Sequence, residues 1–465
     1  MPARVVAIIA TVTVAVAVDG ATSAADAPRA AGVAPTSVMR HCALPSSGGF
    51  ATATLAQEAL DPAAVSQAVA YASTHLRTSV QIFRNYCRVA TGPLDPVTDR
   101  LPWNVWSSTK SVVSMLTGIA ADQHKLALDD PIGMYLPTGP GWGDAAHRAI
   151  TIRELLTETA GLQEAIGSEA ATIGIDPNIA QEALAQPLTH TPGTHFEYSQ
   201  RDPDLLAYVV QRAVGMDLQT FAQRNLFGPL GIPRSSYFWL RDRSGDTYGY
   251  AYLFIPPAQF AKLGLLMQSN GAWNGRQIIS ARYVHQVAQP TPTNGCYGLL
   301  FWTNAGQPCT SANIPDAQTV HHSMIPSAPA DLYAMVGAFQ QNTFIIPSLH
   351  MTVTWTGMLG DTTPNLPGLL SASPAASDLY YTFFRILMHG VQDRHIPDPG
   401  PYTAPPQDFD VNPTHYADPR VLLHDLAANP HCNLLLCDST IPTQGLAQNG
   451  HAITRTLLAS ITTPH

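Results

Sequence analysis

The segment from Ser107 to Lys125 constrains this chain more than any other, because it joins the clearest helical pattern to an unusual pair of side chains. Ser107 and Lys110 stand three residues apart at its start, so both project from the same side of a helix. Only three of the chain's 24 basic residues are lysines, and the other 21 are arginines. Apolar residues recur along the segment at the spacing of one helix face: Val112, Met115, Leu116 and Ile119.

Lys110 offers a chemistry that arginine does not. Arginine keeps its proton in a protein, whereas a desolvated lysine can release one and then accept another. In a dry site Lys110 would take the proton of the Ser107 hydroxyl, and the N-terminus of the helix would favour the alkoxide and the oxyanion that follow. The alternative is that Ser107 only caps the helix and Lys110 is solvated. The Ser-x-x-Lys spacing predicts a serine hydrolase, provided that other segments agree.

Other segments do agree. The sequence VWSSTK of residues 105–110, followed by LALDDP of residues 126–131, closely resembles the serine β-lactamase-related family. This family includes class C β-lactamases, D-alanyl-D-alanine carboxypeptidases, family VIII esterases and 6-aminohexanoate-dimer hydrolases. Three more segments match in the same order, so the likeness spans residues 60–390: ITIRELLTETAGL of residues 150–162, PGTHFEYSQ of residues 192–200 and QFAKLG of residues 259–264.

The resemblance implies roles for further residues. Tyr198 becomes the second catalytic acid or base, which passes a proton between Lys110 and the leaving group. Gln200 stands where the family has an asparagine, so its amide reaches a shifted place in the substrate site. The family's third motif, Lys/His-x-Gly, falls on residues 335–337, and it places Gly337 beside the substrate. Backbone N–H groups of Ser107 and Ala338 then form the oxyanion hole.

Residues 335–337 read Met-Val-Gly and contain no cation, which bears on the substrate. β-Lactams and peptidyl-D-alanine carry a carboxylate that this cation normally helps to bind. Neutral small-molecule esters or amides are therefore the expected substrates, unless Arg201 or Arg241 replaces the cation. A β-lactamase or D-alanyl-D-alanine carboxypeptidase is the first alternative. A catalytically inactive cell-wall or ligand sensor on the same fold is the second.

An early strand, a helical middle from residue 150 to about 240 and late strands predict an α/β (α+β) fold. The resemblance specifies it as β-lactamase and penicillin-binding-protein-like, with an antiparallel sheet flanked by helices and a helical insertion domain. Strands are expected at residues 78–90, 297–302, 342–346 and 350–356. Helices are expected at 61–77, with Asp61 as N-cap, and at 107–125, 151–156, 204–214 and 377–389. Four segments are predicted, namely a signal peptide at 1–27, a flexible mature N-terminus at 28–55, the β-lactamase-related serine hydrolase domain at 56–392 and a Pro-rich C-terminal extension with a disulfide at 393–465.

The N-terminus and the cysteines predict a secreted or periplasmic protein. The apolar run of residues 5–18 suits an export signal and is too short for a membrane span, and no later segment is long enough either. Six cysteines suggest disulfides in an oxidising compartment and allow 15 connectivities. Closeness in sequence favours Cys296–Cys309 and Cys432–Cys437, which leaves Cys42–Cys87.

Cofactors and nucleic acids are not expected. The net charge of −9 provides no basic stripe for a phosphate backbone. The pair His321-His322 is a weak metal candidate, because neighbouring residues on a strand point to opposite faces and no carboxylate stands at ligand spacing. The sequence therefore predicts a hydrolase without a metal or cofactor.

Overall fold

The computed structural model describes residues 39–46, 48–163, 175–312, 317–358, 360–361, 374–405, 432, 435–437 and 439–462. The predicted signal peptide at residues 1–27 lies outside the described residues, as does the part of the predicted flexible N-terminus up to residue 38.

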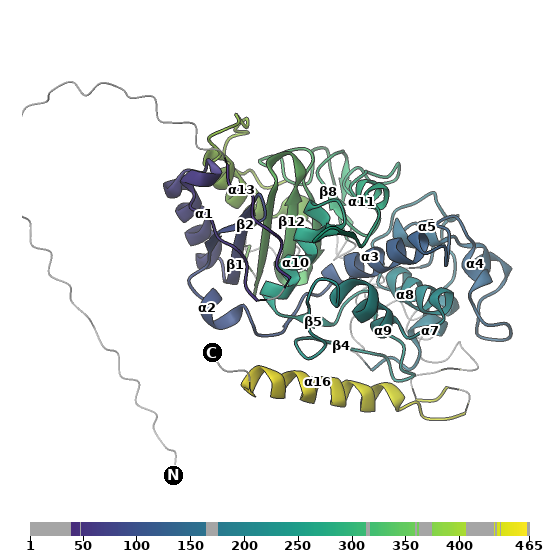
Figure 1. Ribbon diagram of the computed structural model, residues 1–465. Coiled ribbons are helices and arrows are strands. Elements are labelled where there is room, and N and C mark those ends of the chain that lie inside the picture. Colours follow the sequence, from purple (N-terminus) through teal and green to yellow (C-terminus); the bar gives the residue numbers. More distant parts are fainter. Residues whose placement is uncertain are drawn as a thin grey trace, which may run out of the picture. The chain divides into compact units, whose positions relative to one another are not determined.

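A six-stranded antiparallel sheet forms the centre of the fold (Figure 1), in the order β2-β1-β13-β12-β11-β8. The first long strand pairs with the last one, so segments more than 250 residues apart lie side by side, with Val80 opposite Trp355. Asn85 and Tyr86 form the turn between the first two strands in the left-handed conformation, as expected for a two-residue hairpin. The strands are β1 (Arg77–Arg84), β2 (Cys87–Thr91), β8 (Trp302–Thr303), β11 (Tyr333–Gly337), β12 (Gln341–Ile346) and β13 (Met351–Gly357).

Helices cover the sheet and continue beyond its β8 edge. Those nearest the sheet are α1 (Pro62–Thr74), α3 (Ser108–Asp122), α10 (Pro257–Gln268) and α13 (Asp378–His389). The others are α2 (Asp95–Thr98), α4 (Ala145–Ala149), α5 (Ile152–Leu156), α7 (Ile179–Ala185), α8 (Arg201–Val214), α9 (Leu218–Ala222), α11 (Ala281–Val287) and α16 (Gln444–Thr462). A small three-stranded sheet has β5 (Leu253–Ile255) between β3 (Trp103–Asn104) and β4 (Phe238–Trp239). Two-stranded sheets are formed by β6 (Ala272–Trp273) with β7 (Arg276–Gln277) and by β9 (Cys309–Thr310) with β10 (Thr319–Val320).

Alternation along β12 and β13 gives the sheet two different faces. Phe344 and Trp355 pack against aromatic rings of α13, while Thr343 and Thr352 face α10. Gly264 allows α10 to approach, because a Cβ there would lie 2.2 Å from the Thr343 methyl carbon. The sheet is therefore held between α13 on one face and α10 on the other.

The segment that carries Ser107 lies where the sheet meets the helical region. α3 packs against β11 on one side and against α8 on the other. Just before α3, β3 pairs with β5, and the Val105 amide donates to the Leu253 carbonyl at 3.0 Å. In Figure 1 the helices α3, α5 and α8 form one group beside the sheet. These contacts fix the N-terminus of α3 at the boundary between the two regions.

Most predicted elements are confirmed. Asp61 caps α1, with its carboxylate accepting from the Ala64 amide at 2.8 Å, and Ser377 caps α13. α3, α5, α8, β12 and β13 also lie where the sequence predicted them. The antiparallel sheet with its flanking helices is the predicted fold.

The strand predicted at residues 297–302 is wrong over most of its length. The Gly298 amide donates to the Phe301 carbonyl at 2.8 Å, and Leu300 has a left-handed φ of 55°. Gly298 also passes so near the Val287 carbonyl that a Cβ would lie 2.1 Å from that oxygen. Close packing therefore bends this apolar run into a turn, and β8 begins only at Trp302.

The C-terminal extension contains a helix that the sequence did not predict. α16 packs against β4, and the Asn449 side chain bonds both the amide and the carbonyl of Arg241, each at 2.9 Å. The Thr456 hydroxyl donates to the Tyr237 carbonyl at 2.9 Å. Tertiary contacts rather than a strong helical pattern thus fix this segment.

The disulfides are Cys296–Cys309 and Cys432–Cys437, which closeness in sequence favoured, and Cys42–Cys87, the pair that these two leave. Cys42–Cys87 holds the segment around residue 42 against β2, where the Arg88 amide also donates to the Ala51 carbonyl at 2.8 Å. The described part of residues 28–55 is therefore attached to the sheet, although the sequence predicted a flexible segment. None of the helices in the described ranges is both long and apolar enough to cross a bilayer.

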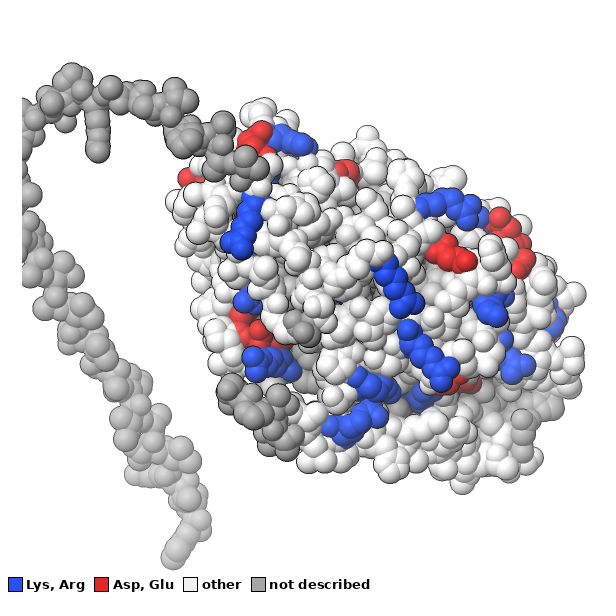
Figure 2. Space-filling model, viewed as in Figure 1, with Lys and Arg blue, Asp and Glu red and all other residues white. Residues whose placement is uncertain are grey.

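Charged side chains are sparse on the surface. Figure 2 shows them scattered singly or in small groups over a face made mainly of other residues. This agrees with a charged fraction of only 12% in the chain.

Candidate active site

Ser107 occupies the N-terminus of α3 and is half-buried. It has near-helical dihedral angles, and its side chain makes no capping hydrogen bond. The next serines of the helix are used differently, because the Ser108 hydroxyl donates to the Gln341 carbonyl at 2.8 Å and the Ser111 hydroxyl to the Leu300 carbonyl at 2.6 Å. The capping alternative for Ser107 is therefore not supported.

Lys110 is buried one turn along α3 and points toward Tyr198. Its Nζ lies 3.5 Å from the centroid of the Tyr198 ring. The ammonium donates to Glu158 Oε1 at 2.8 Å and to the backbone carbonyl of Ser199. The alternative of a solvated Lys110 is excluded, because the residue is only 1% exposed.

Tyr198 joins Ser107 to Lys110. Burial raises the pKa of Tyr198, while the charge of Lys110 and hydrogen bonds with Ser107 and Lys110 lower it. The negative charge of Glu158 acts in the raising direction. The fold thus brings Ser107, Lys110 and Tyr198 together, although the third comes from a loop almost ninety residues further along the chain.

Glu158 is the functional candidate that the sequence did not identify. It is fully buried, and burial raises its pKa to about 7 against the opposing effects of the Lys110 charge and hydrogen bond. Tyr297 is a further hydrogen-bond partner of the carboxylate. A signal was present, because Glu158 interrupts the otherwise uncharged sequence LLTETAGL. The direction of the Glu158 side chain toward Lys110, however, depends on the tertiary fold.

Left-handed backbone conformations occur around this site at residues with side chains. Each costs about 1–2 kcal/mol and persists where neighbouring contacts hold it. Asn104 Oδ1 accepts from the Trp106 amide at 2.9 Å, and the Arg77 guanidinium donates to the Phe339 and Gln340 carbonyls at 3.1 and 2.7 Å. The residues of the site in this conformation, with φ between 46° and 62°, are Trp106, Glu158, Phe339 and Gln340.

The end of β11 runs against the segment that leads into Ser107. A Cβ on Gly337 would lie 2.2 Å from the Val105 carbonyl oxygen, so only glycine fits there. Ala338 follows at the start of the turn Ala338–Gln340. Gln200 is buried at the N-terminus of α8, two residues after Tyr198. Gly337 therefore lies beside the segment that leads into Ser107, and Gln200 follows Tyr198 closely in the chain.

Comparison with known proteins identifies the family. Residues 69–356, more than half of the chain, match the family model described as Beta-lactamase. The chain belongs to the Beta-lactamase family. This is the superfamily of serine β-lactamases and penicillin-binding proteins that the sequence motifs resemble.

Individual relatives of the Beta-lactamase family are distant. Protein flp of Staphylococcus aureus strain N315 is 25% identical over 152 residues, which cover 32% of this chain and 30% of flp. The chain thus matches about a third of the length of its curated relatives. Among solved structures, a candidate β-lactamase of Bacteroides dorei DSM 17855 has a TM-score of 0.53 at 16% identity, covering 70% of this chain and 99% of the other. A candidate 6-aminohexanoate-dimer hydrolase of Bacillus anthracis has a TM-score of 0.52 at 13% identity, with 75% and 86% covered. These likenesses show the β-lactamase and penicillin-binding-protein fold.

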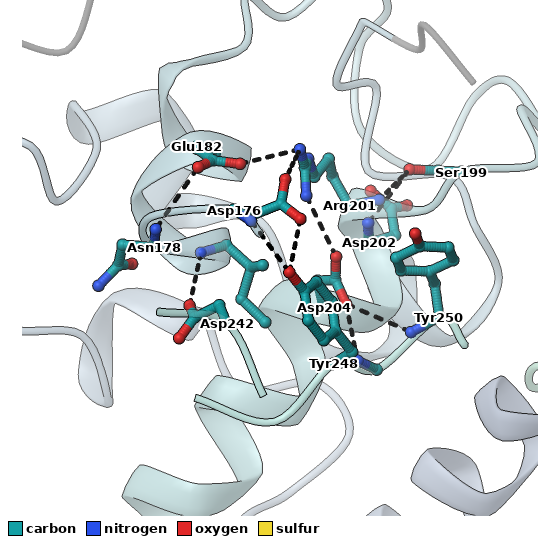
Figure 3. A network of polar contacts seen from close by, with 12 residues as sticks. Asp176, Asn178, Glu182, Ser199, Arg201, Asp202, Asp204, Asp242, Tyr248 and Tyr250 are labelled. Atoms are coloured by element: carbon teal, nitrogen blue, oxygen red, sulfur yellow. Dashed lines mark hydrogen bonds and ion pairs between the residues drawn. The ribbon is translucent and has the colours of Figure 1, made fainter. Parts of the chain in front are cut away.

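Within this Beta-lactamase fold, the two arginines considered as replacements for the missing cation are engaged elsewhere. Arg201 is fully buried and lies at ion-pair distance from Asp176, Glu182 and Asp204 (Figure 3). The Arg241 guanidinium lies 2.7 Å from the Asp217 carboxylate. Protein carboxylates thus already hold both guanidinium groups.

Proposed function

We propose that this chain is an exported serine hydrolase that cleaves a neutral ester or amide through a covalent acyl-serine intermediate. The contact between Lys110 and Tyr198, with Ser107 hydrogen-bonded to the tyrosine, carries the proposal. A nucleophile within reach of groups that exchange protons is the arrangement that nucleophilic catalysis requires.

In the proposed mechanism, Ser107 Oγ attacks the substrate carbonyl carbon while its proton passes through Tyr198 to Lys110. The oxyanion is held by the backbone N–H groups of Ser107 and Ala338. When the tetrahedral intermediate collapses, the C–O or C–N bond breaks and the leaving group takes up the proton. Water then attacks the acyl-enzyme by the same route in reverse, which releases the acid and restores Ser107.

Glu158 explains how the buried ammonium of Lys110 can take part in proton transfer. A single proton distributed between Lys110 and Glu158 leaves the pair able to accept the proton of Ser107. A second proton on the pair blocks that step, and the Glu158 pKa of about 7 sets the pH below which the second proton is bound. The proposal therefore assigns Glu158 the role of tuning the base.

Aromatic side chains favour a neutral substrate with an apolar group. Trp106 precedes Ser107, and its ring lies 5.3 Å from that of Phe339 and 6.0 Å from that of Tyr252. Phe339 is 39% exposed, so part of its ring is open to contact with a ligand. Together with the uncharged residues 335–337, these rings offer apolar contact rather than a carboxylate partner.

Export is proposed from the three disulfides and the apolar N-terminal run. A β-lactamase or D-alanyl-D-alanine carboxypeptidase is the alternative within the family. A catalytically inactive sensor is the alternative from another class. Its weakness is that a non-catalytic site has no physical need for a buried lysine beside a serine.

A three-substrate assay separates these functions. Purified protein is compared on p-nitrophenyl butyrate, nitrocefin and a D-Ala-D-Ala peptide, together with the variants Ser107→Ala and Ser73→Ala. Ser73 is a matched control, because its hydroxyl only donates to the Val69 carbonyl within α1. We expect ester turnover that Ser107→Ala abolishes and Ser73→Ala preserves.

Labelling with an activity-based serine probe, mapped by mass spectrometry, adds an independent readout. An adduct on Ser107 supports the hydrolase. Unchanged ester turnover in Ser107→Ala overturns it, and the absence of both turnover and adduct favours the sensor. Faster turnover of nitrocefin or peptide than of ester would move the chain to the first alternative.

A further inference from the structure

We propose that His190, His195 and Glu197 form a binding site for a divalent transition-metal ion of the zinc type. One ligand atom from each of these side chains lies within 4.8 Å of the other two. The two imidazole rings stack with their centroids 4.1 Å apart. Both histidines are exposed and Glu197 is half-buried, so an ion can reach them from solvent. The inference goes beyond the proposed hydrolase and does not depend on it.

A tight turn brings these residues together. Gly193 has a left-handed φ of 81°, and Thr194 donates to the Thr191 carbonyl through both its amide, at 3.2 Å, and its hydroxyl, at 2.7 Å. The chain therefore reverses between His190 and His195. His190 and His195 stand five residues apart in an irregular segment, and this spacing does not indicate that their side chains meet. The sequence therefore predicted no metal.

Backbone hydrogen bonds hold the loop against the neighbouring segment of residues 158–161. The Thr189 amide donates to the Gly161 carbonyl at 2.9 Å, the Gly193 amide to the Thr159 carbonyl at 2.8 Å, and the Glu197 amide to the Glu158 carbonyl at 3.0 Å. The positions of the three ligands are thus largely fixed before a metal binds, and only side-chain rotation is needed. A preorganised site loses less conformational entropy on binding.

The ligand set selects the class of metal. Two imidazoles and one carboxylate suit Zn²⁺, Co²⁺, Ni²⁺ or Cu²⁺, whereas Mg²⁺ and Ca²⁺ prefer all-oxygen sites. In tetrahedral zinc sites the ligand atoms lie about 3.4 Å from one another, a spacing that follows from Zn–N bonds of about 2.0–2.1 Å. Small rotations of the exposed rings reach this spacing. Three protein ligands leave a fourth position for water or another ligand.

The location links this site to the catalytic candidates. Glu197 immediately precedes Tyr198, yet Phe196 and Tyr198 are buried while Glu197 is more exposed. The metal would therefore sit on the outer side of the loop whose inner side contacts Lys110. Binding would stabilise the loop and would make the protein more resistant to heat.

Metal binding is measured directly and without an activity assay. The full chain is freed of metal with a chelator and dialysed, then titrated with ZnCl₂ by calorimetry and with CoCl₂ by visible absorption. We expect one equivalent of Zn²⁺, ligand-field bands with Co²⁺ and no binding of Mg²⁺. His190→Ala and His195→Ala should each abolish binding, and Glu197→Gln should weaken it. The matched control is His285→Ala, an exposed histidine on α11.

Thermal unfolding completes the test. Zn²⁺ should raise the unfolding midpoint of the unmodified chain and of His285→Ala, but not that of His190→Ala or His195→Ala. Without metal, all these variants should melt together, because the replaced imidazoles are exposed. Absence of Zn²⁺ binding by the unmodified chain overturns the proposal, as does unchanged binding in His190→Ala and His195→Ala.

Discussion

Two buried clusters of charge lie near the N-termini of α3 and α8, and they contain different cations. Lys110 faces the single carboxylate of Glu158, one helical turn from Ser107. Arg201, three residues after Tyr198, lies against three carboxylates in Figure 3, those of Asp176, Glu182 and Asp204. Both clusters are almost completely shielded from water.

The two clusters differ in whether a proton can move. Arginine keeps its proton even when it is buried, so Arg201 can only neutralise the acids and tie α7 and α8 together. Lysine can exchange its proton, and Lys110 stands beside two groups that titrate, Glu158 and Tyr198. A buried ion pair can therefore take part in proton transfer only if one of its members can exchange its proton.

Burial alone does not make a lysine catalytic. Lys262 on α10 is 3% exposed, and its ammonium donates to the Gly231 carbonyl at 3.0 Å. Burial lowers the pKa of Lys262, yet its bonding partner is a carbonyl that does not titrate. The scarcity of lysine in the composition therefore identified a candidate, and the surrounding groups distinguish Lys110 from Lys262.

The largest expected effect comes from making the two cations alike. Lys110→Arg keeps the positive charge and removes the exchangeable proton. We expect kcat/KM on p-nitrophenyl butyrate to fall by about 10³-fold, within the range that positioned acids and bases contribute. Lys125→Arg, at an exposed position, should change little. Activity near that of the unmodified chain in a folded Lys110→Arg protein would show that Lys110 serves only as a charge.

Removing the other cation should affect stability. Arg201→Met leaves three buried carboxylates without their partner, so we expect the free energy of unfolding at pH 7.5 to fall by about 3–5 kcal/mol. Urea denaturation monitored by circular dichroism measures this change. The exposed Arg276→Met provides the control. A loss within about 1 kcal/mol, the range of exposed ion pairs, would mean that Arg201 does not hold this region together.

Glu158→Gln tests the tuning of the base. In the unmodified chain kcat/KM should rise as pH increases through about 7, because the Lys110–Glu158 pair then loses the second proton that blocks transfer. The substitution should remove this rise and lower kcat/KM by about 10- to 100-fold, the lower part of the range for acid–base groups. The control Glu58→Gln replaces another buried glutamate, which accepts from Asn85 away from the site. A pH profile unchanged by Glu158→Gln would assign the transition to another group.

The smallest expected effect is on the pH dependence of stability. Burial raises the pKa of Asp204 to about 7 against the lowering charge of Arg201, so the folded chain keeps a proton that the unfolded chain releases near pH 3.8. The folded state binds more protons between these values, and the stability this proton contributes at low pH is lost as pH rises toward 7. Asp204→Asn removes the titration and should flatten the curve of unfolding free energy against pH by up to about 1.4 kcal/mol per pH unit. An unchanged slope would exclude Asp204 as its source.

Local sequence patterns predicted much of the fold, because local contacts decide those elements. Asp61 before Pro62 caps α1, Ser377 caps α13, and alternation along β13 places Thr352 and Trp355 on opposite faces. Each of these outcomes depends on residues a few positions apart. Closeness in sequence likewise predicted the disulfides Cys296–Cys309 and Cys432–Cys437.

Elements that depend on distant partners escaped prediction. α16 contains Gly445 and Gly450, which weaken a helical pattern, and its contacts with β4 fix it. The apolar run that ends at Trp302 resembled a strand until packing against Val287 bent it. In both places tertiary contact outweighs local preference.

The candidate active site likewise combines one feature that local spacing decides with others that depend on distant contacts. Ser107 and Lys110 share one helix face because of their spacing alone, since three residues make nearly one helical turn. The contact of Glu158 with Lys110 and the enclosure of Arg201 by three acids depend instead on how distant segments pack. These contacts join residues between 19 and 48 positions apart, or three positions apart on a buried helix end. Burial then sets the pKa of Glu158, since desolvation depends on everything packed around a carboxylate and not on its neighbours in the chain.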